Sequence, residues 1–178
     1  MRVVAGRFGG RALVAPRGRA TRPTSDRVRE ALFSILGDSV AGTRVLDLFA
    51  GSGALAIEAL SRGASDATLV DSSAAAVAAI RRNLAEVGIE AEVRRQDALA
   101  YLRRASRDAR QYDLVFLDPP YRHAGALGRE LSTALGPVLA PPARVVAESD
   151  RRAPLDLDLD LLDERRYGDT LIRIHGPR

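Results

Sequence analysis

The chain of 178 residues contains no cysteine, no tryptophan and no lysine, and it has only two histidines. Without cysteine it has no disulfide, no thiolate ligand for a metal and no cysteine nucleophile. The two histidines, His123 and His175, lie far apart without the spacing of metal ligands, so we expect no metal site. For the same reason Ser52 has no evident histidine partner, which disfavours a serine hydrolase.

Long apolar runs are also missing. The longest uncharged run, residues 131–143, has 13 residues and three prolines, whereas a membrane-spanning helix needs about 20 apolar residues. The arginine-rich start lacks the apolar region of a signal peptide. Because cysteine is absent as well, we predict a cytoplasmic protein with no membrane contact.

All 27 basic residues are arginines, and the 23 acidic residues leave a net charge of +4. This charge is uneven, since residues 1–30 have a net charge of +6 and residues 31–178 one of −2. The N-terminal arginines are Arg2, Arg7, Arg11, Arg17, Arg19, Arg22, Arg27 and Arg29. Guanidinium groups match the geometry of phosphate, so this cluster predicts a polyanionic partner.

Short apolar runs alternate with stretches of helical periodicity from residue 24 onward, which is typical of an α/β fold. We predict parallel strands at 43–48, 66–71, 90–95, 112–118 and 143–148, and a closing antiparallel hairpin within 157–174. We predict helices at 53–62, 73–87, 97–106 and 124–136, after a first helix that is capped by Thr24 or Ser25 and stops at Gly37. The result is a mostly parallel seven-stranded sheet with helices on both faces. This domain, residues 23–178, follows a small arginine-rich β-hairpin at residues 1–22.

A glycine-rich turn follows the first predicted strand. The strand ends at Asp47, and a helix opens at Gly53 after Phe49, Gly51 and Ser52. Backbone can approach a nucleoside at such a turn, yet neither a dinucleotide nor a triphosphate motif is present. The pattern Asp-x-Phe-x-Gly-x-Gly instead resembles motif I of Rossmann-like methyltransferases that depend on S-adenosylmethionine. Asp71 ends the second strand, where a carboxylate binds ribose hydroxyls or caps the next helix.

The fourth predicted strand ends in Asp118-Pro119-Pro120-Tyr121, which resembles motif IV of methyltransferases acting on exocyclic amines of nucleobases. Such an amine is a weak nucleophile, because its lone pair is delocalised into the ring. The Asp118 carboxylate and the Pro119 carbonyl can accept its N–H bonds and hold the nitrogen in line with the methyl group. Tyr121 can stack on a base drawn out of its helix. The alternative is a rigid turn that ends a buried strand.

Residues 2–13 and 22–33 resemble the start of the RsmD-type 16S ribosomal RNA guanine-N2 methyltransferases, and with both motifs the resemblance covers essentially the whole chain. It implies methyl transfer from S-adenosylmethionine to the 2-amino group of one guanine in 16S rRNA, within an assembled or assembling 30S subunit. The implied cofactor residues are Asp47, Phe49, Gly51, Gly53, Asp71 and Asp97, with Thr24 and Arg27 as weaker candidates. The implied catalytic residues are Asp118, Pro119 and Tyr121. The implied RNA-binding residues are Arg2, Arg7, Arg11, Arg17, Arg19 and Arg22.

Several alternatives remain open at this level. Asp97 also suits the cap of the helix that follows it. A DNA N6-adenine methyltransferase, or one acting on another RNA, can share the Asp-Pro-Pro-Tyr motif, although the chain has no room for a DNA-recognition domain. A non-catalytic RNA-binding assembly factor would retain the fold without turnover. We expect a monomer.

Overall fold

The computed structural model describes residues 1–16, 25–119 and 124–177 of the chain. Its centre is a seven-stranded sheet in the order β3-β2-β1-β4-β5-β7-β6. The first five strands in this order are parallel, and β7 and β6 close the sheet as an antiparallel pair, which confirms the predicted fold class. The bounds are β1 Arg44–Leu48, β2 Asp66–Asp71, β3 Glu92–Arg95, β4 Tyr112–Leu117, β5 Leu139–Asp150, β6 Asp160–Tyr167 and β7 Thr170–Gly176.

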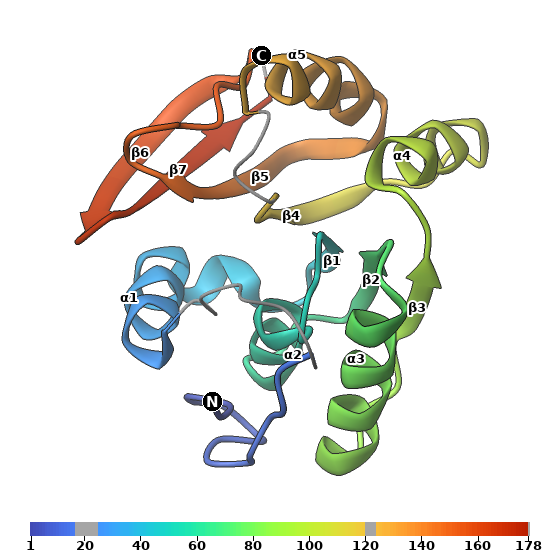
Figure 1. Cartoon of the computed structure of the whole chain (residues 1–178), viewed down its shortest axis with the longest axis vertical. Coiled ribbons are helices and arrows are strands. Elements are labelled where there is room, and N and C mark those ends of the chain that lie inside the picture. The colour runs from blue at the N-terminus through green and yellow to red at the C-terminus, as the bar shows by residue number, and fades with distance from the viewer. Residues whose placement is uncertain (17–24, 120–123, 178) are drawn as a thin grey trace.

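Helices cover both faces of this sheet, with α4 and α5 on one side and α1, α2 and α3 on the other (Figure 1). Their bounds are α1 Asp26–Leu36, α2 Ala54–Ser61, α3 Ala74–Val87, α4 Ala98–Arg107 and α5 Ala124–Leu135, with short 3-10 helices at Gly37–Val40 and Gly136–Val138. Ser25, Ser73 and Asp97 cap α1, α3 and α4 through their side chains. These caps satisfy backbone N–H groups that the first helical turn leaves unpaired, so the helices begin close to the predicted positions.

The central strands are buried on both faces because their side chains alternate between two hydrophobic cores. In β1, Val45 packs toward α1, α2 and α3, whereas Leu46 and Leu48 pack toward α4 and α5. In β4, Phe116 lies in the first core and Leu117 in the second. Strands covered on both sides read as continuous apolar runs, which is why the sequence predicted them well.

Two details at the C-terminal end differ from the predictions. Strand β5 is longer than the predicted 143–148 and includes two prolines, which lie where its register with β4 shifts. Proline is tolerated at such an irregularity because no ladder hydrogen bond is required there. The strand predicted from residue 157 begins only at Asp160, since the preceding residues cross α5 instead. There the Asp158 N–H donates to Ser132 Oγ at 2.8 Å.

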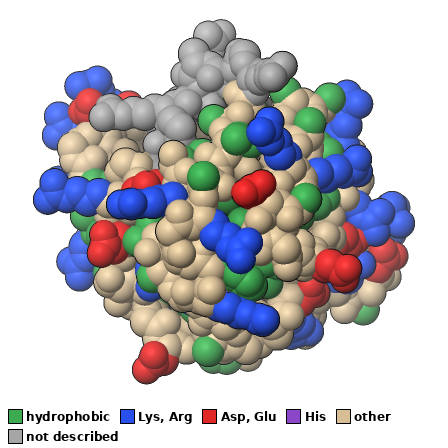
Figure 2. All heavy atoms as spheres, turned by 90° about the horizontal axis from the view of Figure 1, so that it is seen from below, with side chains coloured by type: hydrophobic (Ala, Val, Ile, Leu, Met, Phe, Trp, Pro, Cys, Tyr) green, Lys and Arg blue, Asp and Glu red, His purple; other side chains and the backbone are tan. Residues whose placement is uncertain are grey.

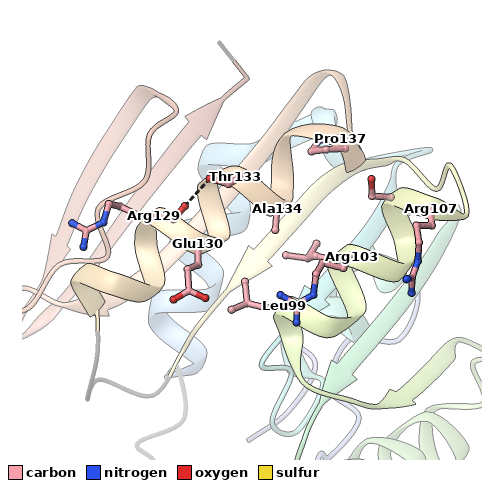
Figure 3. A pocket seen from close by; sticks show the side chains of 10 residues that line it. Leu99, Arg103, Arg107, Arg129, Glu130, Thr133, Ala134 and Pro137 are labelled. Carbon is pink, nitrogen blue, oxygen red and sulfur yellow. Dashed lines mark hydrogen bonds between the residues drawn. The ribbon is translucent and has the colours of Figure 1, made fainter.

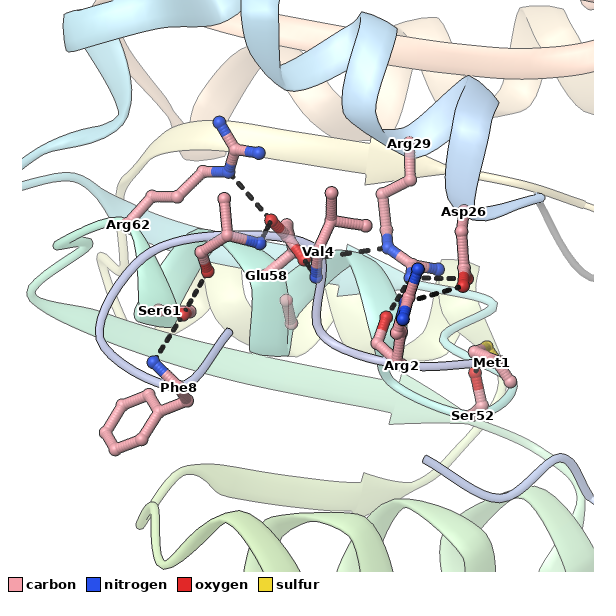
Figure 4. A network of polar contacts seen from close by, with 12 residues as sticks. Met1, Arg2, Val4, Phe8, Asp26, Arg29, Ser52, Glu58, Ser61 and Arg62 are labelled. Atoms are coloured by element: carbon pink, nitrogen blue, oxygen red, sulfur yellow. Dashed lines mark hydrogen bonds and ion pairs between the residues drawn. The ribbon is translucent and has the colours of Figure 1, made fainter. Parts of the chain in front are cut away.

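The N-terminal segment, residues 1–16, lies against α2 and α3. The two sides of the predicted hairpin meet at a single antiparallel bridge between Arg2 and Ala12 and form no longer strands. Val3 and Leu13 are buried in the core beneath α1, α2 and α3. Backbone N–H groups that would extend a strand ladder are bound instead by side chains of α2, because Val4 and Ala5 donate to the Glu58 carboxylate at 2.7 and 3.0 Å. Figure 4 shows this contact.

The backbone at Gly6 lies so close to α2 that a substitution there tests whether the segment is docked. Gly6 has a φ of +79°, and a Cβ there would lie 2.0 Å from the Ser61 carbonyl oxygen. The control is Gly10, whose φ is +87° but around which no described atom would lie within 4 Å of a Cβ. We expect Gly10→Ala to cost about 1 kcal/mol for the left-handed backbone. Gly6→Ala should cost about 1–3 kcal/mol more, because the segment must move away from α2.

Urea unfolding of the two variants measures this difference. Equal losses of stability would show that the segment is not held against α2.

Candidate active site

The candidate site lies at the carboxyl edge of the parallel strands. Leu48, at the end of β1, is paired with Val70 of β2 on one side and with Leu117 of β4 on the other. The residues that follow, Phe49, Asp71 and Asp118, therefore share one edge. The strand order reverses on the two sides of β1, and a crevice at such a switch point is where ligands bind in open α/β sheets.

The turn after β1 has an unusual backbone. Phe49, Gly51 and Gly53 have φ values of 63°, 58° and 76°. A non-glycine residue in this region is strained, and such strain persists only where the surroundings hold it. Here the Ala50 N–H donates to the Val70 carbonyl at 3.1 Å, and the Gly53 N–H donates to the Ala50 carbonyl at 2.7 Å. A Cβ at Gly53 would lie 2.8 Å from Leu69 Cδ2, so glycine is required for α2 to start this close to the sheet.

The Asp71 carboxylate is bound directly to this turn. It accepts the Gly51 N–H at 3.0 Å and the Ser73 N–H at 2.8 Å, and the side chain is buried. Ser73, not Asp71, is the N-cap of α3. The structure thus brings Asp71 together with the glycine turn, as a ribose-binding carboxylate requires.

Asp97 lies two residues after β3 at the same edge and is exposed. Its carboxylate accepts the Ala100 N–H at 2.9 Å and caps α4. Asp97 therefore caps α4, which is one of the two roles that the sequence allowed for it. A contact of Asp97 with a cofactor stays a prediction.

Asp47, near the end of β1, is a buried acid with a strongly raised pKa. It is 2% exposed, and Oδ2 accepts the Ala56 N–H at 3.2 Å. Burial raises the pKa of the Asp47 carboxyl to about 7, and the nearby Asp71 charge adds to this effect while the Ala56 hydrogen bond opposes it. Carboxyl groups with a strongly shifted pKa cluster at functional sites, where a ligand can change their protonation state.

This pKa predicts how stability depends on pH. Because the native Asp47 keeps its proton between about pH 4 and 7 while the unfolded chain has lost it, Asp47 lowers stability as pH rises through that window. We expect Asp47→Asn to be more stable than the wild type above pH 7, on the order of 2–4 kcal/mol, with the advantage vanishing near pH 4. Urea unfolding at successive pH values tests this, and a difference independent of pH would contradict it.

The predicted catalytic residues are only partly described. Asp118 is half-buried and Pro119 is buried directly after β4, next to the end of β1. Tyr121 and Thr24 lie outside the described residues, as does His123. Arg27 is exposed on α1.

Three of the predicted RNA-binding arginines can be placed. Arg2 lies 3.8 Å from Asp26, Arg7 lies over the Phe8 ring at 5.2 Å, and Arg11 Nη1 donates to the Glu86 carbonyl at 3.1 Å. Arg17, Arg19 and Arg22 lie outside the described residues. Figure 2 shows the molecule from below, with arginines distributed over this face and acidic side chains between them.

A buried polar network lies beside the turn and was not predicted from the sequence. Glu58 and Arg29 are both fully buried, with Arg29 Nε 3.7 Å from Glu58 Oε2 (Figure 4). Asn83 is also buried, and its amide accepts the Val14 N–H at 2.8 Å and donates to the carbonyls of Val14 and Ser52 at 2.9 Å. These residues join the N-terminal segment to the glycine turn. The available signal was Glu58, the only charge in the apolar stretch of α2.

Two features are absent from the described part of the chain. It holds no group of three or more histidine, cysteine, aspartate or glutamate side chains placed to bind a metal. None of its helices combines the length and the apolar character needed to cross a membrane.

The chain is similar in sequence and in fold to known proteins. The family model described as Conserved hypothetical protein 95 matches residues 1–176. YlbH of Bacillus subtilis is 38% identical over 100% of both chains. The ribosomal RNA small subunit methyltransferase D of Haemophilus influenzae is 33% identical over 98% of this chain and 93% of its own. The solved structure of yhhF from Escherichia coli has a TM-score of 0.82 and 33% identity, and covers 100% of this chain and 98% of its own.

Sequence similarity to these relatives and fold similarity to the solved structure extend over nearly the full length of the chains. The chain therefore belongs to the Conserved hypothetical protein 95 family, that of the RsmD-type ribosomal RNA methyltransferases.

Proposed function

We propose that this protein transfers the methyl group of S-adenosylmethionine to the N2 amine of a guanine in 16S rRNA, within the assembled or assembling 30S subunit. The observation that carries the proposal is the placement of Asp118-Pro119 one strand away from the glycine turn of Phe49–Gly53. A methyl donor held at the turn and a base held after β4 would meet at one edge. Family membership supports both the donor and the RNA substrate.

The cofactor would lie along the ends of β1 and β2. Its ribose would contact Asp71, its methionine part would lie near Asp47 and the turn, and Asp97 would contact the adenine amine. S-adenosylmethionine supplies an electrophilic methyl group on a sulfonium. The buried Asp47 carboxyl, already close to ionisation at neutral pH, would be stabilised in its charged form by a cationic ligand.

The chain's own contribution to the chemistry is positioning. The Asp118 carboxylate and the Pro119 carbonyl accept the two N–H bonds of the target amine and hold its nitrogen toward the methyl group. No strong base is required, because the nitrogen becomes acidic once methylated and then gives its proton to water. Pro119 lacks an N–H group, so its backbone cannot compete as a donor.

Methylation assays with a radiolabelled donor test the proposal. The substrates are 30S subunits from a strain without the modification, naked 16S rRNA and duplex DNA. We expect label in the subunits, and mapping should place it on N2 of one guanine. Label found only in DNA would identify an adenine methyltransferase, and no label with intact cofactor binding would identify an assembly factor. Either result would refute the proposal.

The N-terminal arginines provide a second prediction. We propose that Arg7 and Arg11 contact RNA phosphates, since both are exposed on the docked segment and neither forms an ion pair within the described residues. Changing both to Gln should raise KM for the RNA substrate about tenfold at low salt and leave cofactor affinity unchanged. Unlike a deletion, these changes keep the contacts with Glu58. A KM equal to that of the wild type would show that these two arginines do not bind RNA.

A further inference from the structure

A second cationic surface lies away from the N-terminal segment, in a groove between α4 and α5. The groove encloses about 680 Å³. Its apolar lining includes Leu99 and Leu102 of α4, Ala134 of α5 and Pro137 beyond it. In Figure 3, Glu130 and Ala134 of α5 lie on the side toward Leu99 and Arg103 of α4, whereas Arg129 extends away from α4 at the margin of the groove.

The charge of the groove is strongly unbalanced. Arg103 and Arg107 line it from α4 and Arg129 from α5, against the single acid Glu130. All four are exposed, and no ion pair involves these three arginines in the described part of the chain. By contrast Arg104, next to Arg103 on α4, pairs with Asp108 at 3.5 Å.

Two of these arginines also repel each other. Arg103 and Arg107 are four positions apart on one helix, where like charges are neighbours and destabilise the helix slightly. An anion between α4 and α5 would relieve that repulsion. The groove is therefore complementary to a negatively charged occupant that also has apolar surface.

The position of the groove favours RNA as this occupant. Helix α4 begins immediately after β3, and α5 follows the Asp118-Pro119 strand end, so both helices start at the edge where the target base would be held. A strand of RNA running from this edge along the two helices would have its phosphates and unstacked bases next to α4 and α5. Arginine planes stack on such bases while their charges bind phosphate.

We infer that the α4–α5 groove binds single-stranded rRNA flanking the target guanine. The inference rests on the proposed function, because it assumes an RNA substrate. Along α4 from Leu99 to Arg107 the groove is about 12 Å long at 1.5 Å per residue, enough for about three nucleotides stacked at roughly 3.4 Å each. It adds a second phosphate-binding surface to the one on the N-terminal segment.

The double variant Arg103→Gln/Arg107→Gln tests the inference in methylation assays on unmodified 30S subunits. We expect KM to rise about tenfold, with kcat and cofactor affinity unchanged. The dependence of log KM on log salt concentration should become shallower by about 1.4, the value for two phosphate contacts with a single strand. The matched control is Arg44→Gln/Arg104→Gln, which removes two exposed arginines that are paired outside the groove.

A crosslinking experiment identifies what occupies the groove. The chain has no cysteine, so Thr133→Cys places a single attachment point for a photo-crosslinker in the groove, and Ser39→Cys places one on the exposed 3-10 helix before β1. We expect the crosslinker attached at position 133 to react with 16S rRNA near the methylated guanine. The crosslinker attached at position 39 should react with no rRNA.

The outcomes separate the two proposals. If the wild type methylates subunits but the groove variant retains its KM and salt dependence, the groove inference is wrong and the proposed function stands. A crosslink from position 133 to a ribosomal protein would also overturn it, in favour of a protein partner. If the wild type methylates no RNA, the proposed function fails before any variant is compared.

Discussion

Replacing Asp118 with Ala should lower kcat for methyl transfer at least about 10²-fold, while the Kd for S-adenosylmethionine changes by less than about threefold. Asp118 follows β4 and is half-buried, whereas the proposed cofactor contacts follow β1 and β2. The substitution removes an acceptor from the target amine and leaves the glycine turn intact. Its effect should therefore fall on the chemical step. Rapid-quench methylation and calorimetric cofactor titration measure the two quantities.

Asp113 provides the matched control on the same strand. It lies at the opposite end of β4, where its carboxylate accepts the Arg44 N–H at 2.8 Å and Arg44 Nε at 3.0 Å. Asp113→Asn should lower stability and leave kcat at the wild-type value. Asp118→Asn retains one acceptor oxygen and should lose less activity than Asp118→Ala. If Asp118→Ala turned over normally, Asp118 would have no role in holding the amine.

Replacing Glu58 with Gln should lower the free energy of unfolding by about 3–5 kcal/mol, the cost of breaking a buried ion pair by removing one partner. Oε1 accepts the Ala5 N–H at 3.0 Å and Arg62 Nε at 2.8 Å, and Oε2 accepts the Val4 N–H at 2.7 Å. An amide has only one acceptor oxygen, so its NH₂ must face a backbone donor in either orientation. Arg29 would also lose the charge that lies against its Nε.

Equilibrium unfolding in urea measures this loss, with Glu86→Gln on the exposed face of α3 as control. The control should change stability by less than about 0.5 kcal/mol. The double variant Arg29→Met/Glu58→Gln should be less destabilised than the sum of the single variants, because both charges are then absent. Strict additivity would show that the two side chains do not interact in the native state.

The strands and helices were predictable because their local signals agree with their environments. Asp97 illustrates this, since a capping aspartate after a short strand marked the start of α4 within one residue. Residues 141 and 142 illustrate the converse. Two prolines argue against a strand, and only the irregular pairing with β4 shows why β5 continues through them.

The candidate site was predictable in part. The glycine turn, Asp71 and Asp118 are marked by their positions at strand ends, and parallel strands bring those ends together. Arg29 was not recognisable, because in the sequence it is one more arginine in a basic region, whereas in the structure it is fully buried next to Glu58. Arg29 and Glu58 are 29 positions apart, so no local sequence pattern indicates that they are in contact. Asn83 was missed for the same reason.

The docking of the N-terminal segment has a consequence for the order of folding during synthesis. Val4 binds Glu58, 54 positions later, and Val14 binds Asn83, 69 positions later. Residues 1–16 therefore lack these two partners until α2 and α3 have been made. They are synthesised before α2 and α3 and should become ordered only after both helices have formed. Until then the arginines of this segment are not held against the rest of the domain.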